Sequence, residues 1–536
     1  MKTKFLCLLA TSLTLAFFQQ AFAATSLLQP NDRIVFIGDS ITGQGANIPS
    51  GWAHQIENVL RETNPDGHYT FVSLGGSGQT VGSWQSVEKK SRSESAILDV
   101  KTVDVKEALD QPAGVVICML GMNDVLRPSL KDAPEDFEKW AASYRELIKA
   151  VRERAHPRVF ALATPTMCTE DPDSPKNQVM EKLIAKIGEI AKTENCVVLP
   201  TYETMREVLD EGRTYQPKFH VTGDSVHPGG PGHAAIAAGM LKGLGEDRAA
   251  AKLREKLKSE IVQRAGPDAL SYTVERMPSD LKSNKETFVI RYFAHPSQPA
   301  SSPKASLSLP DGWKLISSKN DAGGGEFKVE GVPGRLVNRL LLQVDAMQAE
   351  ISIPAPWLIG VGNVGGNCWF QGRDFDPNKK ISACDDSLRT GAGFGELAEI
   401  EPGHPLVWKR QIASVDFGGE NAPGAVDMAA VTFYQNFDVA YAARWIYSET
   451  ERPLTIQIQP KGFGADSYMT LWWNGEKLFS DPIKTEKNRA LPVTVRKGWN
   501  SLVFKSNHCQ TQWQFLVDLA GENLDGLRVS ASPPSQ

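Results

Sequence analysis

The chain has 536 residues, of which 41% are hydrophobic and 23% charged, and its formal net charge is -5. This balance is typical of a globular protein of about three to four domains and excludes a mainly disordered chain. A net negative charge argues against non-specific nucleic-acid binding, and no collagen, heptad or solenoid repeat is visible.

The first residues have the pattern of a secretory signal peptide. Lys2 and Lys4 precede an apolar run over 5–18 that is short for a bilayer span, and Ala21-Phe22-Ala23 resembles a cleavage site. We therefore expect cleavage after Ala23 and a secreted or periplasmic product. Six of the seven cysteines follow this site without a CxxC motif, and a disulfide between Cys368 and Cys384 stays open.

Residues 24–245 alternate between short apolar runs and segments with helical spacing. This alternation predicts βαβ units, a parallel sheet and a three-layer α/β/α sandwich, in which ligands bind at the carboxyl ends of the strands. The expected strands are 33–37, 69–74, 114–120, 158–163 and 196–199. The expected helices are 52–62, 137–151, 176–192 and 232–244.

The pattern changes after this unit. Residues 246–269 are charged and predict a helical linker, and short strands with frequent Gly and Pro follow. We expect a β-sandwich over 270–355 and a second β-rich domain over 356–536. Asn474-Gly475 after two tryptophans predicts a hairpin turn. Eight of the twelve tryptophans lie from Trp357 onward, which suggests different tasks for the two halves.

Four short segments of the first unit carry polar residues suited to chemistry. Each alone has a plain structural interpretation: a helix cap, an ordinary Gly-rich loop, an Asx turn, and a surface His beside a helix or half of a metal site. In the last segment, the spacing lets Asp224 fix the tautomer of His227 and leave Nε2 as a base. The segments are Gly38-Asp39-Ser40-Ile41-Thr42, Ser73-Leu74-Gly75-Gly76-Ser77-Gly78-Gln79-Thr80, Gly121-Met122-Asn123-Asp124 and Asp224-Ser225-Val226-His227-Pro228.

Together, and in this order, the four segments resemble the blocks of the GDSL/SGNH hydrolase family over about residues 31–245. The resemblance implies a flavodoxin-like α/β fold and a serine esterase with Ser40 as nucleophile, His227 as general base and Asp224 as its orienting acid. It also implies an oxyanion hole formed by the Ser40 and Gly78 N–H groups and the Asn123 side chain. Ser73 stands where many members have Asn.

The remaining polar residues of this unit have plainer interpretations. We expect His54 and His233 to be structural, and Asp39 and Asp124 to organise their loops. His220 has no carboxylate at a suitable spacing, which makes a role in substrate binding improbable.

The second half resembles two kinds of β module. Residues 305–313 resemble immunoglobulin-like modules of secreted carbohydrate enzymes, while Trp473-Asn474-Gly475 and Lys497-Gly498-Trp499-Asn500 resemble galactose-binding-like jelly rolls. Such modules bind sugars through tryptophan faces, although the same side chains also pack β cores. The candidate carbohydrate contacts are Trp369, Trp408 and Trp472.

These observations favour a secreted serine hydrolase that deacetylates a polysaccharide or glycan through an acyl-enzyme on Ser40. We expect no metal or organic cofactor, no nucleic-acid partner and no integral membrane segment. The substrate would be an acylated glycan or another small ester. Two alternatives stay open: a lipolytic esterase or lysophospholipase, and a non-catalytic carbohydrate-binding surface protein.

Overall fold

The computed structural model describes most of the chain from residue 26 to residue 534. The ranges left out between these ends are 88–92, 96–101, 127–129, 131, 173, 278–280, 282, 297–303, 322, 364–384, 397, 402–403, 412–413, 418–419, 428–437, 462–467, 483–487, 509–513, 522–523 and 525. The expected signal peptide and the two cysteines of the possible disulfide, Cys368 and Cys384, therefore lie outside the described residues. No helix in the described part of the chain is long and apolar enough to cross a membrane.

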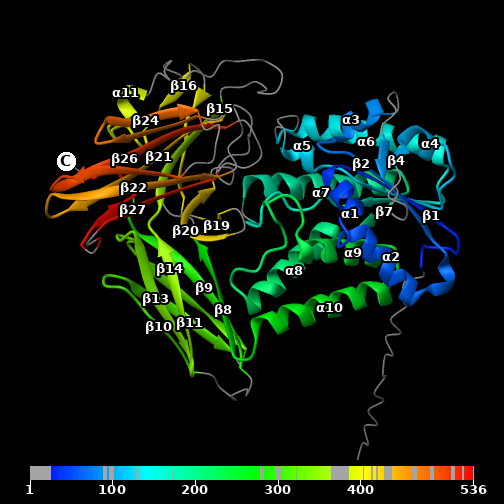
Figure 1. Cartoon of the computed structure of the whole chain (residues 1–536), viewed down its shortest axis with the longest axis horizontal. Helices are drawn as coiled ribbons and strands as arrows, with labels where there is room; N and C mark the ends of the chain where they lie inside the picture. The colour runs from blue at the N-terminus through cyan, green and yellow to red at the C-terminus, as the bar shows by residue number, and fades with distance from the viewer. Residues whose placement is uncertain are drawn as a thin grey trace, which may run out of the picture.

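The first half is an α/β unit built on a parallel sheet of five strands (Figure 1). Its strands, in the spatial order β2-β1-β5-β6-β7, are β2 Thr70–Gly75, β1 Arg33–Gly38, β5 Val115–Met119, β6 Val159–Ala163 and β7 Val197–Leu199. Every residue of β5 and β6 is buried, as the continuous apolar runs predict for central parallel strands. The predicted parallel sheet is confirmed.

Ten helices of the described chain belong to this unit. They are α1 Ser40–Asn47, α2 Trp52–Thr63, α3 Val81–Val87, α4 Val105–Leu109, α5 Met122–Leu126, α6 Pro134–Ala155, α7 Pro175–Thr193, α8 Thr201–Tyr215, α9 Gly230–Gly243 and α10 Asp247–Ala265. Short pieces η1 Pro65–Gly67, β3 Ser93–Ser95 and β4 Thr102–Asp104 lie between them. Helix α9 packs against α2, α8 and α10, while α6 packs against α3 and α7, so two groups of helices cover the sheet.

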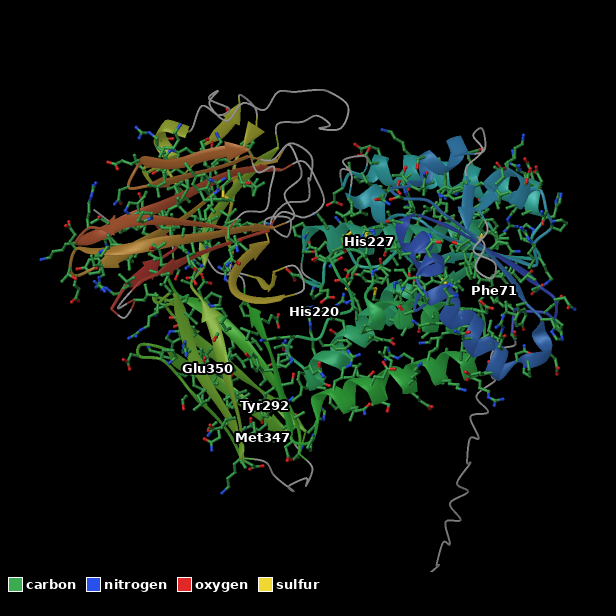
Figure 2. All side chains as sticks on the ribbon, in the orientation of Figure 1. Phe71, His220, His227, Tyr292, Met347 and Glu350 are labelled. Carbon is green, nitrogen blue, oxygen red and sulfur yellow. The ribbon has the colours of Figure 1, made fainter. Side chains whose placement is uncertain are left out.

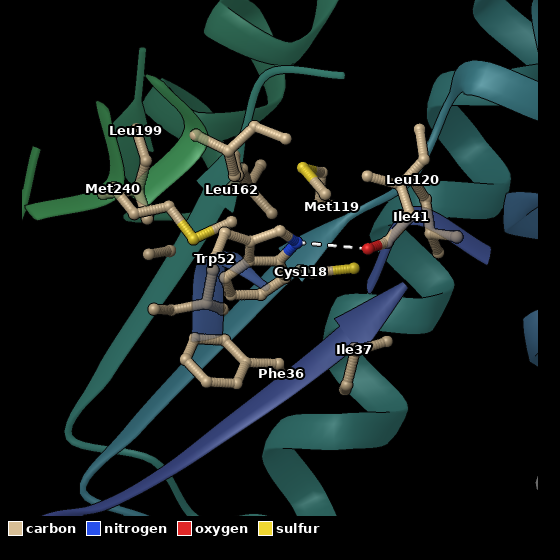
Figure 3. Packing of buried hydrophobic residues seen from close by; sticks show 14 of the residues in the cluster. Phe36, Ile37, Ile41, Trp52, Cys118, Met119, Leu120, Leu162, Leu199 and Met240 are labelled. Carbon is tan, nitrogen blue, oxygen red and sulfur yellow. Dashed lines mark hydrogen bonds between the residues drawn. The ribbon is translucent and has the colours of Figure 1, made fainter. Parts of the chain in front are cut away.

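Two features of this unit differ from the sequence-based expectation. Helix α8 was not predicted, although it packs against α9. Helix α10 is more than a linker, because Leu253, Leu257 and Ile261 belong to the same buried core as the sheet. Figure 3 shows part of that core, where the Trp52 indole meets Phe36 edge to face at a centroid distance of 4.8 Å.

The middle of the chain forms two antiparallel sheets. They are ordered β11-β12-β9-β8 and β10-β13-β14 and enclose one core around Phe288, Ile290 and Leu342. The strands are β8 Ala269–Arg276, β9 Glu286–His295, β10 Ala305–Ser308, β11 Lys314–Asp321, β12 Gly324–Gly331, β13 Val337–Val344 and β14 Met347–Pro354.

The last part is also antiparallel. A seven-stranded sheet contains β18-β15-β21-β26-β23-β24 with β28 beside β21, and a five-stranded sheet has the order β19-β20-β27-β22-β25. Side chains of both sheets share one core. The elements are β15 Trp357–Asn363, α11 Asp385–Leu388, β16 Glu399–Glu401, β17 His404–Pro405, β18 Val407–Gln411, β19 Ser414–Phe417, β20 Glu420–Asp427, β21 Asp438–Ser448, β22 Arg452–Lys461, β23 Tyr468–Trp473, β24 Glu476–Pro482, β25 Arg489–Val495, β26 Gly498–His508, β27 Gln514–Ala520 and β28 Arg528–Ser530.

The predicted hairpin at Asn474-Gly475 is confirmed. Strands β23 and β24 pair antiparallel on either side of it, and both turn residues have positive φ, at 50° and 81°. This is the geometry of a type I′ turn, which the Asn-Gly pair favours.

Candidate active site

The turn after β1 places Ser40 at the carboxyl edge of the parallel sheet. Strand β1 ends at Gly38, and Ser40 is the first residue of α1. Asp39 caps this helix, since its Oδ1 accepts the Ile41 N–H at 2.9 Å. A Cβ on Gly38 would lie only 2.8 Å from the Met119 carbonyl oxygen, so a side chain at this position would push β1 away from β5.

A compact hairpin before α9 carries Asp224 and His227. The Gly223 N–H donates to the His227 carbonyl and the Gly229 N–H to the Val221 carbonyl, each at 2.8 Å. Ser225, between the two functional side chains, has a φ of 70°, a left-handed conformation that is uncommon for a residue other than glycine. The carboxylate oxygen Oδ1 of Asp224 accepts the backbone N–H of His227 at 2.6 Å and so closes the turn.

The structure joins these two segments by hydrogen bonds. Ser40 Oγ lies 2.9 Å from His227 Nε2, and His227 Nδ1 lies 2.7 Å from Asp224 Oδ2. Since an ionised carboxylate only accepts, Nδ1 carries a proton that it donates to Asp224, and Nε2 accepts from the Ser40 hydroxyl. The arrangement can withdraw the hydroxyl proton and stabilise the resulting imidazolium.

The protonation states of His227 and Asp224 follow from their contacts. The hydrogen bond to Asp224 raises the pKa of His227 above its usual 6.5, and the charges of Asp224 and Asp39 act in the same direction against burial. Burial on its own would raise the pKa of Asp224, but the bonds from His227 and from the Val226 N–H together hold it below its usual value. The pair therefore favours an ionised carboxylate beside a basic imidazole.

The two loops predicted to supply the oxyanion hole meet beside Asp39. The Asn123 amide in α5 donates to the Gln79 carbonyl oxygen at 3.0 Å and to Asp39 Oδ2 at 3.4 Å. The Gly76 N–H donates to the Gly38 carbonyl oxygen at 3.1 Å. Gly78 has a φ of 69°, which glycine adopts at no steric cost.

Two buried carboxylates support this edge of the sheet. Burial raises the pKa of Asp39 to about 6 and that of Asp124 to about 7. Asp124 Oδ2 accepts the Val81 N–H at the start of α3. Both side chains thus organise backbone, as expected.

Three of the other histidines of the unit have different environments. His54 Nε2 lies 2.7 Å from the Ala46 carbonyl oxygen, a structural contact. His233 is 2% exposed, and neither ring nitrogen has a hydrogen-bond partner within the described part of the chain. His220 does have a carboxylate partner, contrary to the expectation, because Glu170 Oε2 lies 2.8 Å from its Nδ1. Spacing could not reveal a partner 50 residues away.

Two of the three candidate carbohydrate contacts, Trp408 and Trp472, lie among the described residues. Trp369 lies outside the described residues. Trp472 is 7% exposed within an apolar core, and Trp408 packs on Phe394 while its indole N–H donates to the Glu396 carbonyl at 2.6 Å. The described surroundings of Trp408 and Trp472 are those of packing residues.

Comparison with known proteins places this site in a family. Residues 36–235 match the family model of the GDSL-like lipase/acylhydrolase family. These residues form a GDSL-like hydrolase domain. The chain thus carries a carboxylic ester hydrolase domain, and the resemblance noted in the sequence is confirmed. The match ends at Ala235, within α9, so it covers the four segments and none of the β-rich half.

Solved structures similar to this chain include an acetylxylan esterase from Geobacillus stearothermophilus. It shares 23% sequence identity with a TM-score of 0.32, and the match covers 41% of this chain and 96% of that one. An α/β hydrolase from the metagenome of Lake Arreo, Spain, shares 22% identity with the same TM-score, over 41% of this chain and 98% of that one. Likenesses of this size carry no argument about activity. No curated protein matches the chain.

Among the described residues, no group of three or more His, Cys, Asp or Glu side chains is arranged to hold a metal ion. The two ring nitrogens of His227 bond to Asp224 and to Ser40.

Proposed function

We propose that this chain is an exported serine esterase that removes short acyl groups, acetyl foremost, from a polysaccharide or related glycan through an acyl-enzyme on Ser40. The observation that carries the chemistry is the continuous chain of hydrogen bonds from Ser40 Oγ through the His227 ring to Asp224. Export is supported by the leader-like first residues and the glycan by the appended β regions.

The first half-reaction follows from these contacts. His227 Nε2 takes the hydroxyl proton as Ser40 Oγ attacks the acyl carbonyl carbon, and Asp224 stabilises the imidazolium. The carbonyl oxygen becomes an oxyanion, for which the Ser40 and Gly78 N–H groups and the Asn123 amide are the proposed donors. The tetrahedral intermediate then collapses, and the leaving alcohol takes the proton from Nε2.

The second half-reaction returns the enzyme. Water gives its proton to His227 Nε2 as its oxygen attacks the acyl-enzyme carbonyl. The second tetrahedral intermediate collapses, Ser40 Oγ leaves with that proton, and the carboxylic acid is released. The residues described account for every proton transfer in the two steps.

Hydrolysis of p-nitrophenyl acetate by the purified mature chain tests the chemistry. We expect turnover by the wild type and its loss in Ser40→Ala, with an unchanged circular dichroism spectrum. Absence of wild-type turnover, or full activity in the Ser40→Ala variant, contradicts a serine esterase.

Release of acetate from a panel of acetylated polysaccharides then tests the substrate class, wild type against Ser40→Ala. Release from at least one glycan supports the proposal. A chain-length preference for esters of eight carbons or more would instead favour the lipolytic alternative, and glycan binding without ester turnover would favour the non-catalytic one.

A further inference from the structure

A second buried carboxylate lies at the base of the hairpin that carries Asp224 and His227. Glu170 belongs to the loop between β6 and α7, and its side chain is 4% exposed. Its burial requires partners, because an ionised carboxylate taken out of water without them is strongly unfavourable. Neither the four family segments nor the proposed mechanism includes Glu170.

One oxygen of Glu170 binds the backbone of the hairpin. Oε1 accepts the Val221 N–H at 2.8 Å and the Thr222 N–H at 2.7 Å. The Thr222 hydroxyl donates to the same oxygen at 2.9 Å. Three donors therefore converge on one atom from two successive residues, which fixes the direction in which the chain enters the hairpin.

The other carboxylate oxygen of Glu170, Oε2, has two partners. His220 Nδ1 lies 2.8 Å from Oε2, and Arg213 Nη2 of α8 lies 3.1 Å from it. Burial acts to raise the pKa of Glu170, but His220, Arg213 and the Thr222 N–H together keep it below its usual value. Glu170 is thus an ionised anchor rather than a proton carrier.

The residues that Glu170 binds, Val221 and Thr222, form the first side of the hairpin. Thr222 forms an isolated β-bridge with Pro228, and the Gly223 N–H donates to the His227 carbonyl, so the two sides of the hairpin are linked to each other. The tip between them is the strained turn at Ser225, whose positive φ has to be held by the surrounding structure. A shift at the base of the hairpin would be passed on to the His227 ring, since only four residues lie between Thr222 and His227.

We propose that Glu170 is a positioning residue that holds the Asp224–His227 hairpin at hydrogen-bond distance from Ser40. The inference rests on the proposed function, because it assigns the base and its acid to that hairpin. Figure 2 labels His220, which directly precedes the anchored hairpin, and His227, which lies in it, on the side of the α/β unit nearer the β-rich half.

Three variants of the full chain test the proposal. Glu170→Ala removes the anchor, Glu170→Gln keeps an oxygen acceptor for the Val221 and Thr222 N–H groups, and Glu211→Ala is the matched control. Glu211 lies on α8 and pairs with Arg254 and Lys258, away from the hairpin. The readouts are kcat and KM for p-nitrophenyl acetate, and the low-field proton resonance of His227 Nδ1–H, assigned by its loss in His227→Gln.

We expect kcat to fall about 100-fold in Glu170→Ala, the size of effect that a misplacement of about 1 Å produces. KM should change less than threefold, the His227 resonance should broaden or vanish, Glu170→Gln should recover most of kcat, and Glu211→Ala should match the wild type. A folded Glu170→Ala protein with wild-type kcat and an unchanged resonance overturns the proposal.

Two further outcomes are also decisive. If Glu170→Ala does not fold, Glu170→Asp replaces it: the charge stays but the carboxylate is withdrawn, and a wild-type kcat would again overturn the inference. If the wild type turns over no ester, the proposed function fails on its own. The His227 resonance still tests the anchor in that case, since it reports the hairpin geometry without turnover.

Discussion

At the residue scale, the neighbours of His227 determine the pH range in which its ring can act as a base. The hydrogen bond to Asp224 raises its pKa above 6.5, and only the neutral imidazole can take the Ser40 proton. We therefore expect kcat/KM to rise with pH through an inflection above 6.5. A pH–rate profile for p-nitrophenyl acetate measures it, and an inflection below 6.5 would contradict the assignment.

Replacement of the orienting acid gives a second prediction. Asp224→Asn removes the charge that raises the His227 pKa and leaves the ring free to adopt the other tautomer. The acidic limb of the profile should move to lower pH, and kcat should fall about 10⁴-fold, as for the equivalent change in a serine protease. Equal activity of Asp224→Asn and the wild type would show that Asp224 has no role in the reaction.

His233 provides a prediction about stability. Burial lowers the pKa of His233 to about 4. Within the described structure, neither ring nitrogen has a hydrogen-bond partner that would stabilise the charged form. The unfolded chain takes up a proton near pH 6.5 and the folded chain only near 4, so the free energy of unfolding falls as pH falls between these values. Relative to His233→Leu, the wild type should lose about 3 kcal/mol across this window.

Urea unfolding of both proteins at pH 7 and pH 4 measures that difference. Identical pH dependence of the two proteins would show that the ring is solvated or paired in the folded state.

At the element scale, the contact between α1 and the end of β2 controls where Ser40 lies. A Cβ on Gly75 would be 2.2 Å from the Gly43 nitrogen, which is backbone and cannot turn aside. Gly75→Ala should therefore destabilise the domain by about 1–3 kcal/mol and lower kcat through displacement of α1. Thermal melts and ester kinetics test this.

Gly188 provides the matched control. It lies in the interior of α7, and apart from its chain neighbours and the adjacent backbone of its own helix, no heavy atom lies within 4 Å of an added Cβ. Gly188→Ala should stabilise the protein by about 0.5–1 kcal/mol because alanine favours the helix. If Gly75→Ala and Gly188→Ala changed the free energy of unfolding in the same direction, packing at Gly75 would not explain the effect of Gly75→Ala.

Sequence patterns predicted those elements whose cause is local. The apolar runs predicted β5 and β6, and the Asn474-Gly475 pair predicted the turn between β23 and β24. The polar segments that follow the strands were recognised from neighbouring residues alone. Helix α8 was not predicted, because it begins at Thr201, only two residues after β7 ends at Leu199, and no loop segment separates the two elements. Glu170 could not be found either, since its partners lie about 50 residues later and its own surroundings have no motif.

At the scale of the whole molecule, buried charges join the two β regions. Arg410 of β18 is paired with Glu286 of β9 at 2.8 Å, and their side chains are 2% and 1% exposed. Arg276 of β8 binds the same carboxylate. Removal of a shared buried partner leaves cations without compensation, so Glu286→Ala should cost about 3–5 kcal/mol.

The control is Glu350→Ala, which breaks the exposed pair with Arg339 and should cost at most about 1 kcal/mol. Urea unfolding followed by tryptophan fluorescence compares the two variants. Equal midpoints would mean that the buried pair contributes nothing to the union of the β regions.

The hydrogen-bonded atoms of Ser40 and His227 are 187 residues apart in the sequence. During synthesis the ribosome releases the hydroxyl long before the imidazole, and the sheet between them must assemble before they can meet. A nascent or truncated chain that stops short of the hairpin therefore carries an inert serine. Reactivity toward esters is acquired in one step, when the last part of the α/β unit folds into place.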